Sequence, residues 1–154
     1  YRIEEVPLGP MLEALVEQQR PRCESAGMSL HFEPVAQNIV VQADRDALEQ
    51  TFLNLLDNAV KYAAKGGHIE LTVQARSEGG WAVSVMDCGP GVPRSQEEKI
   101  FEKFHRVDDS ITAGTPGCGL GLSIARHMMR DMGGDVVYEA RVGGGAVFKV
   151  IIGV

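Results

Sequence analysis

The sequence predicts an α+β fold, a two-layer α/β sandwich in which a mixed, mostly antiparallel sheet of about five strands packs on three helices. Segments with the spacing of amphipathic helices alternate with segments of period-two hydrophobicity, and the extended segments come mostly in pairs. Paired strands between helices favour a layered α+β sheet over a doubly wound one. With 154 residues, the chain has the length of one ordinary domain, so we expect a single domain over residues 1–154.

The first third of the chain is expected to contain a strand, a helix and two further strands. Residues 3–8 alternate in polarity and predict a short strand. The apolar spacing that follows predicts a surface helix over 11–25. Residues 28–32 and 39–41 predict two short strands on either side of the turn-forming segment 34–38.

The middle of the chain is expected to contain a long helix and a hairpin. Asp44 is a favourable N-cap, and the helix after it is expected to end near Ala64, before the glycine pair at 66–67. Residues 68–76 and 81–86 alternate in the manner of strands and are joined by a short glycine-containing connection.

The last third is expected to add a helical turn, a helix and a closing hairpin. Residues 96–101 favour a short helical turn, and residues 119–132 predict a helix that ends at a glycine pair. Residues 136–140 and 146–152 predict two strands, and we interpret the glycines at 143–145 as the turn between them.

Charge and cysteine content argue against several classes of function. The net charge of −6 argues against binding to a nucleic acid backbone, and no basic run points to a membrane surface, so we expect neither partner. Three cysteines without a C-x-x-C pair favour a reducing compartment. No apolar run reaches the roughly 18 residues of a membrane span. We expect Cys88 and Cys118 to be small buried thiols, and the alternative is a redox-sensitive pair.

A polar stripe marks the long helix predicted after Asp44. Asn54, Asn58, Lys61 and Tyr62 lie at helical offsets of 0, 4, 7 and 8 among mainly apolar neighbours. One explanation is that both amides bond to neighbouring loops. The other is that the amide oxygens supply ligands for Mg²⁺ while Lys61 faces a phosphate. The stripe alone leaves the two explanations open.

A glycine-containing loop follows the strand predicted at 81–86. Asp87, Gly89 and Gly91 form a D-x-G-x-G pattern, in which bare backbone would let a flat ligand approach while Asp87 accepts a hydrogen bond from an amine. The alternative is an ordinary turn in which Asp87 caps the backbone. For this motif alone, we favour the turn.

Two further motifs follow in the sequence. Phe101 and Phe104 lie in the segment 100–106, whose simplest interpretation is an amphipathic piece with both rings in the core. The pattern G-x-G-x-G at 117–121 leads into a predicted helix, and bare N–H groups at a helix start can bind anions. It is neither the dinucleotide fingerprint nor a P-loop.

Taken in this order, the four motifs resemble those of the catalytic ATP-binding domain of sensor histidine kinases. The resemblance covers about residues 44–148. It implies the Bergerat ATP-binding fold of the GHKL superfamily, a mixed sheet backed by three helices, with ATP and Mg²⁺ as cofactors. It also implies that a phosphoryl acceptor lies on a separate domain, so that the chain is a fragment of a longer kinase.

The resemblance assigns roles to residues of this sequence. Asn58 would hold Mg²⁺ between the ATP phosphates with help from Asn54, and Lys61 and Arg106 would act in catalysis by contacting phosphate. Asp87 would receive the adenine amino group. The nucleotide-binding residues that the resemblance implies are Asn54, Asn58, Lys61, Tyr62, Asp87, Gly89, Gly91, Phe104, Arg106, Gly117, Gly119, Leu120 and Gly121.

Three positions qualify the resemblance. ATPases that share this fold carry a glutamate where Asn54 stands, and an amide cannot serve as the base that activates water, so we expect phosphoryl transfer rather than fast hydrolysis. Cys88 stands where Asn or Asp is common, which affects hydrogen bonding in the loop. Ala146 stands where Ser or Thr is frequent, so one support of the adenine pocket is absent.

The implied function is transfer of the γ-phosphoryl group of Mg-ATP to a histidine on an upstream dimerisation domain in two-component signal transduction. A response regulator would receive the group next, and the parent kinase would be a homodimer whose catalytic part is cytoplasmic. Whether that parent is an inner-membrane sensor stays open. The alternatives are a serine kinase of the anti-sigma-factor type and a non-catalytic ATP-sensing module. No histidine of the chain lies in the acceptor pattern, so we expect no autophosphorylation of the chain alone.

Overall fold

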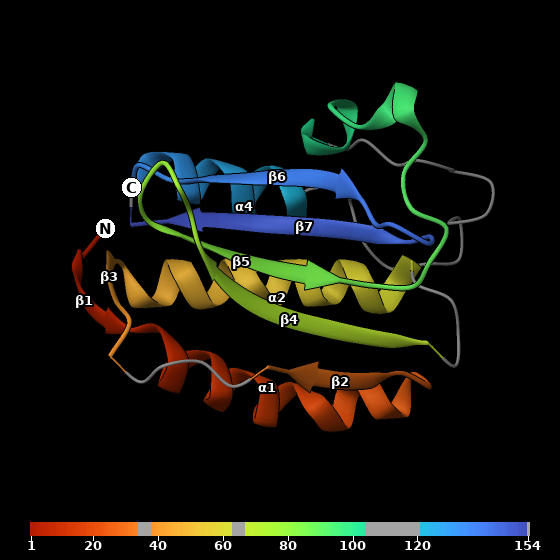
Figure 1. The fold of residues 1–154 in the computed structure, drawn as a ribbon, viewed down its shortest axis with the longest axis horizontal. Coiled ribbons are helices and arrows are strands. Elements are labelled where there is room, and N and C mark those ends of the chain that lie inside the picture. The colour runs from red at the N-terminus through yellow and green to blue at the C-terminus, as the bar shows by residue number, and fades with distance from the viewer. Residues whose placement is uncertain (34–37, 63–66, 104–120, 154) are drawn as a thin grey trace.

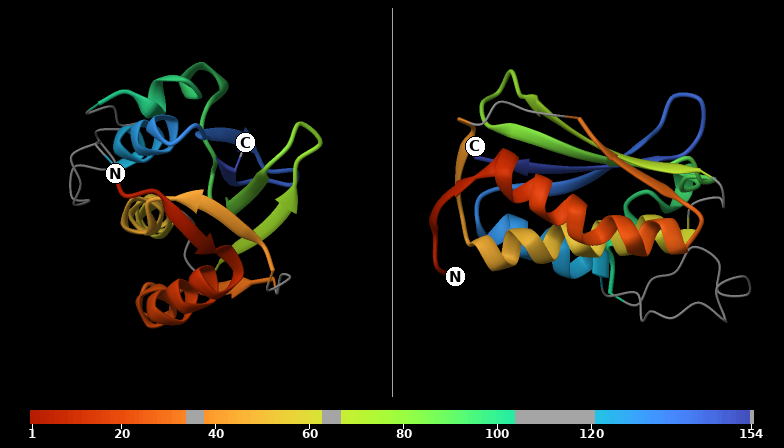
Figure 2. Two further views of the ribbon diagram at one scale, coloured as in Figure 1. Left: turned by 90° about the vertical axis from the view of Figure 1, so that its left-hand side faces the viewer. Right: turned by 90° about the horizontal axis from the view of Figure 1, so that it is seen from below.

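Three α-helices cover one face of a five-stranded sheet, in a computed structural model that describes residues 1–33, 38–62, 67–103 and 121–153. Figure 1 shows the sheet in front of the helices, and the end-on view in Figure 2 separates the two layers. The predicted α+β sandwich is therefore confirmed for the part of the chain that the structure describes.

The main sheet is mixed. Its order is β2-β4-β5-β7-β6, and its members are β2 (Ser29–Phe32), β4 (His68–Ala75), β5 (Trp81–Met86), β6 (Asp135–Ala140) and β7 (Ala146–Ile152). Strand β2 runs parallel to β4, and the other neighbours are antiparallel. Because β5 lies at the centre between β4 and β7, the chain that leaves β5 emerges in the middle of one end of the sheet.

Strands β1 (Glu4–Pro7) and β3 (Val40–Ala43) form a separate antiparallel pair. The two strands predicted at 28–32 and 39–41 therefore do not pair with each other, since β2 joins the large sheet and β3 joins the small one. Both ends of the chain lie near the small sheet, at the left of Figure 1, away from the end where β5 finishes.

Helix α1 (Leu8–Ser25) begins earlier than the sequence predicted. The expected start at Met11 is wrong because Pro10 lies within the first turn of the helix, where a missing N–H group removes no helical hydrogen bond. The N–H of Leu8 instead donates to the carbonyl of Ile39 at 2.9 Å, which ties the helix start to the segment before β3.

Helix α2 (Arg45–Tyr62) begins as predicted at Asp44. The Oδ1 atom of Asp44 accepts a hydrogen bond from the N–H of Ala47 at 2.9 Å, and this bond is the main cause that lowers the pKa of Asp44. The helix buries one face in the core and leaves its polar stripe on another. The buried residues of this face are Ala47, Leu48, Thr51, Phe52, Leu55, Leu56 and Ala59.

Within the described ranges, a third helix and two short helical turns complete the elements. Helix α4 spans Gly121–Asp131, and the predicted helical turn is realised as two 3₁₀ segments, η1 (Arg94–Gln96) and η2 (Lys99–Phe101). Helix α4 packs on α2 and on β6. Among the described residues, no helix has the length and apolar character needed to cross a membrane.

Candidate functional site

Asp87 directly follows the central strand β5. Val83 and Val85 of that strand are buried on the face covered by helices, and the alternation of side chains continues to Asp87, which is only 6% exposed. Its Oδ1 atom accepts hydrogen bonds from the N–H groups of Gly89 at 2.9 Å and Ala146 at 3.2 Å. The carboxylate is therefore buried and held in one orientation.

The backbone of Asp87 is held by the turn between β6 and β7. Its N–H donates to the carbonyl of Ala146 at 3.0 Å, and its own carbonyl accepts from Nη1 of Arg141 at 3.1 Å. Gly145 has a φ of +115°, and a Cβ atom there would lie 2.0 Å from the Asp87 oxygen. The sequence predicts a turn at Gly145, and the structure adds a second need for glycine, the close approach of this turn to Asp87.

The second carboxylate oxygen of Asp87 has a different environment. Among the described residues, no donor lies within hydrogen-bond distance of Oδ2. Buried acceptors in native proteins almost always have a partner, so an N–H group of a ligand would complete this one. The bond from Gly89 also shows that the turn interpretation of this loop is correct. The turn and the ligand interpretation use different oxygens, and they are compatible.

The loop after Asp87 rests on strand β6. Gly91 has a φ of +76°, and a Cβ atom there would lie 2.9 Å from the Gly145 carbonyl oxygen and 3.3 Å from the Tyr138 hydroxyl. That hydroxyl accepts a hydrogen bond from the N–H of Val92 at 2.9 Å, and its ring packs edge-on against Phe148. The packing gives Gly91 a structural purpose, and its predicted role toward adenine stays a prediction.

The polar stripe of α2 faces the start of α4. Nδ2 of Asn54 donates to the carbonyl of Gly121 at 3.2 Å, and Oδ1 of Asn54 accepts from Gln50 at 2.9 Å. The first explanation of the stripe, an amide bonded to a neighbouring segment, is therefore correct for Asn54. Asn58 is half-buried and has no hydrogen-bond partner among the described residues, so its amide is available to a ligand.

Lys61 lies one turn after Asn58 and pairs with a carboxylate of its own helix. Its Nζ atom lies 2.9 Å from Oδ2 of Asp57, and Asp57 also pairs with Arg22 of α1. Burial raises the pKa of Asp57, but hydrogen bonds from Lys61 and Arg22 outweigh that effect, and the pKa lies below its usual value. Tyr62, the last residue of α2, is 40% exposed. The phosphate and adenine roles of Lys61 and Tyr62 stay predictions.

A cluster around Phe101 fixes the end of η2. Phe101 is buried, as its interpretation as a core residue predicted, and it packs edge-on against Phe148 at 6.3 Å between ring centroids. The guanidinium of Arg126 lies 3.7 Å from the centre of the Phe101 ring, and its Nε donates to the carbonyl of Val136. Arg126 thus joins η2, α4 and β6, a role that no sequence pattern indicated.

Several predicted site residues lie outside the described part of the chain. They are Phe104, Arg106, Gly117, Gly119 and Leu120. Of the G-x-G-x-G pattern, Gly121 is described, and the structure brings it to Asn54 as the first residue of α4.

Cys88 corrects one expectation. Its side chain is partly exposed, so it is not the buried thiol that we expected. Its Sγ atom lies 3.2 Å from Nη1 of Arg141 and 3.7 Å from each ring nitrogen of His68. Cys118 lies outside the described residues.

Comparison with known proteins identifies the family. Residues 43–154 match the model of the histidine kinase-, DNA gyrase B- and HSP90-like ATPases. The chain belongs to this ATPase family. It is 37% identical over 109 residues to the sensor histidine kinase WalK of Bacillus subtilis strain 168, a match that covers 70% of this chain and 18% of WalK. It is 35% identical over 145 residues to the adaptive-response sensory kinase SasA of Crocosphaera subtropica, covering 94% of this chain and 37% of SasA.

Solved structures agree with these relatives. The nucleotide-free catalytic domain of the histidine kinase ThkA superposes with a TM-score of 0.84 at 28% identity, over 99% of this chain and 97% of that one. ThkA in complex with the response regulator TrrA superposes with a TM-score of 0.80 over 99% of this chain and 42% of that one. The predicted resemblance to histidine kinase catalytic domains is confirmed, and the chain spans well under half of its curated relatives' length.

Proposed function

We propose that the chain is the part of a sensor histidine kinase that binds Mg-ATP and donates the γ-phosphoryl group to a histidine of a separate dimerisation domain. The observation that carries the proposal is the carboxylate of Asp87. It is buried, one oxygen is held by two backbone N–H groups, and the other has no partner among the described residues. A histidine kinase-type ATPase fold supplies the context.

The adenine end of the site is built around this carboxylate. Oδ2 of Asp87 would accept a hydrogen bond from the exocyclic amino group, and the bare backbone at Gly89 and Gly91 would face the base. Tyr62 would pack its ring on the adenine from the end of α2. Asp87 would contribute most to the choice of base. A base whose amino group pairs with this buried acceptor is strongly preferred over a base that leaves the acceptor unpaired.

The phosphate end of the site lies along α2. The carboxamide oxygen of Asn58, which has no partner within the described residues, is the kind of hard ligand that Mg²⁺ accepts, and Asn54 lies one helical turn before it. When bound with ATP, the ion would offset negative charge on the phosphates. Lys61 would exchange its contact with Asp57 for a phosphate oxygen. By the family resemblance, Arg106 would reach toward the phosphates, and the glycines at 117, 119 and 121 would lie beside the triphosphate.

The chemistry required of these residues is positioning. Phosphoryl transfer needs little covalent chemistry from the protein, and catalysis comes mainly from orientation and charge neutralisation. At position 54 the amide has both of its ends in hydrogen bonds, to Gln50 and to Gly121, and it cannot take a proton from water. We therefore expect the bound nucleotide to persist until an acceptor arrives.

The acceptor lies outside the chain in this proposal. His31 of β2 is exposed and lies 3.3 Å from Glu33, and His127 of α4 is 77% exposed and lies 3.3 Å from Asp131. Within the described residues, these side chains pair with neighbours on or near their own elements. An upstream dimerisation domain in a homodimeric parent would supply the histidine, and a response regulator would receive the group next. We place this part of the parent in the cytoplasm, where ATP is available.

A phosphoryl-transfer assay tests the proposal. The chain would be mixed with Mg-ATP radiolabelled at its γ-phosphate and with the histidine-bearing dimerisation domain of its own parent kinase or, separately, with a serine-bearing anti-sigma-type partner. We expect label on the dimerisation domain that is lost in acid, because phosphohistidine is acid-labile. Acid-stable label on the serine partner would instead support a serine kinase.

A non-catalytic ATP-sensing module is the remaining alternative, and binding measurements distinguish it. In that case Mg-ATP would bind with normal affinity while neither acceptor became labelled. If neither Asp87→Asn nor Asn58→Ala changed the affinity for Mg-ATP, the site assignment itself would be wrong. The sensor-kinase names of the curated relatives favour the histidine acceptor.

A further inference from the structure

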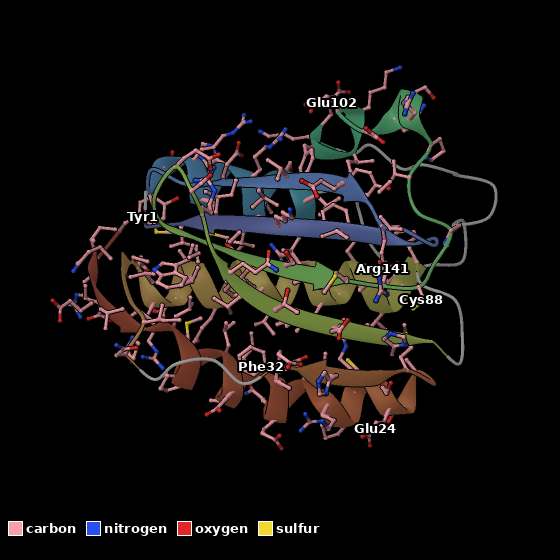
Figure 3. The ribbon with its side chains drawn as sticks, in the orientation of Figure 1. Tyr1, Glu24, Phe32, Cys88, Glu102 and Arg141 are labelled. Atoms are coloured by element: carbon pink, nitrogen blue, oxygen red, sulfur yellow. The ribbon has the colours of Figure 1, made fainter. Side chains whose placement is uncertain are left out.

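Arg141 contacts Asp87 from the face of the sheet opposite the described helices (Figure 3). It follows β6 and reaches across the end of the sheet to the chain that leaves β5. Nη1 of Arg141 donates to the carbonyl of Asp87 at 3.1 Å and to Sγ of Cys88 at 3.2 Å. Figure 3 shows the side chains of Arg141 and Cys88 next to each other at this end of the sheet.

The guanidinium is itself held in place. Nη2 of Arg141 lies 3.4 Å from a carboxylate oxygen of Glu70 on β4. Its backbone N–H donates to the carbonyl of Gly145 at 3.1 Å, and its carbonyl accepts from the N–H of Gly144 at 3.0 Å. The side chain of Arg141 is only 20% exposed. One side chain thus connects β4, the end of β5 and the closing turn.

These contacts act on the orientation of Asp87. Its carbonyl accepts from Arg141 and lies against Gly145 of the closing turn, while its carboxylate is buried and accepts from Gly89 and Ala146. Because both groups belong to one residue, a bond that fixes the carbonyl also restricts the direction of the carboxylate. Cys88 carries only a weak hydrogen-bonding group, so Arg141 provides the charged donor at this place.

We propose that Arg141 is a positioning residue for adenine recognition, which holds the Asp87 peptide so that the carboxylate meets the amino group of the base. Glu70 orients the guanidinium for this purpose. The inference rests on the proposed nucleotide function and deepens it. No step requires Arg141 to touch the nucleotide, because the guanidinium acts through Asp87 from the opposite face.

Binding of two nucleotides to Arg141→Met tests the proposal. Methionine keeps an unbranched side chain and removes the donors. Calorimetry would compare Mg-ATP with the Mg complex of purine riboside triphosphate, which lacks the 6-amino group. We expect the Kd for ATP to rise roughly threefold to tenfold, the effect of one lost hydrogen bond, and the Kd for the analogue to stay within about twofold. Arg141→Lys should restore part of the ATP affinity, and Glu70→Gln should show a smaller rise.

Lys149→Met is the matched control. It removes a cation from the same face, where Lys149 pairs with Glu139 at 3.0 Å without contacting Asp87, and both affinities should stay unchanged. An equal loss of both nucleotides in Arg141→Met would show general damage and overturn the proposal, as would unchanged ATP binding.

Asp87→Asn separates this failure from failure of the function. If Asp87→Asn weakens ATP binding and Arg141→Met does not, the positioning role is wrong and the proposed function stands. If neither variant weakens ATP binding, both proposals fail. Thermal unfolding of each variant checks that it is folded.

Discussion

The two ends of the proposed nucleotide site are built in different ways. At the Asp87 end, backbone groups of Gly89 and Ala146 and the side chain of Arg141 hold one buried residue from both faces of the sheet. At the α2 end, Asn58 has no partner among the described residues, and Lys61 is occupied by Asp57. The first end is shaped before a ligand arrives, whereas the second has side chains that a ligand must engage.

The difference separates two kinds of contribution to nucleotide binding. A group that is already fixed loses little conformational entropy when a ligand binds, so the Asp87 end should supply affinity and selectivity for the base. The side chains at the α2 end must first leave their present contacts or become ordered, so they contribute less net binding energy. We expect their main contribution to be to the rate of phosphoryl transfer. Changes at the first end should therefore alter stability and binding together, and changes to the ligand-binding side chains of the second should alter phosphoryl transfer more than stability.

Gly145→Ala should have the largest effect. Its Cβ atom would meet the Asp87 carbonyl at 2.0 Å, at a φ of +115° that side chains rarely adopt. We expect the free energy of unfolding to fall by about 3 kcal/mol and ATP affinity to fall with it. Urea unfolding and calorimetry measure both. Gly144→Ala is the control, since its φ is +108° and no atom lies within 4 Å, and it should cost only about 1 kcal/mol. Equal losses would contradict the close-approach argument.

Asn58→Ala should separate transfer from stability. Phosphoryl transfer should fall on the order of a hundredfold, the scale of losing one transition-state contact. The free energy of unfolding should stay the same or rise slightly, since alanine is the better helix former. The measurements are the rate of label transfer and urea unfolding. Glu49→Ala, on the same helix and paired with Arg45, should change neither. A normal transfer rate in Asn58→Ala would remove this residue from the site.

Tyr138→Phe should weaken the loop after Asp87. The hydroxyl accepts the N–H of Val92, and removing it leaves that donor without its partner. We expect a loss of about 1 kcal/mol in the free energy of unfolding, measured with urea, and a small loss of ATP affinity. Tyr62→Phe removes an exposed hydroxyl that has no partner among the described residues and should leave stability unchanged. Stability losses of the same size in both variants would count against the role of the Val92 contact.

Asp57→Asn should have the smallest effect, and it should depend on pH. The pKa of Asp57 is lower in the folded state than in the unfolded state, so the charged form stabilises the fold above the unfolded value of about 3.9. That contribution, below about 1 kcal/mol for a partly exposed pair, should be lost as pH falls through the depressed folded value. Urea unfolding should show wild type and Asp57→Asn converging in acid. A difference that persists far below this range would contradict the assignment.

Sequence reasoning located most elements because their signals are local. The N-cap at Asp44, the stripe on α2 and the alternation of β4 and β5 depend on spacing within one segment. The start of α1 was missed because Pro10 has two interpretations, a chain break or a residue of the first helical turn, and contact with the segment before β3 selects the second. The separate pairing of β2 and β3 was also not predicted, because β2 pairs with β4 and β3 pairs with β1, and no local pattern specifies these partners.

The candidate site shows the same division between features with local signals and contacts between distant segments. The sequence by itself determined the nucleotide motifs, since Asp87 with its glycines and Asn54 with Asn58 are defined by residue type and short spacing. Only the tertiary structure decided what surrounds them. Arg141 lies 54 residues from Asp87 along the chain. The pairing of β5 with β7 brings the β6–β7 turn, which includes Arg141, beside Asp87. Hydrogen bonds and close approaches between distant segments depend on strand register, which no local pattern specifies.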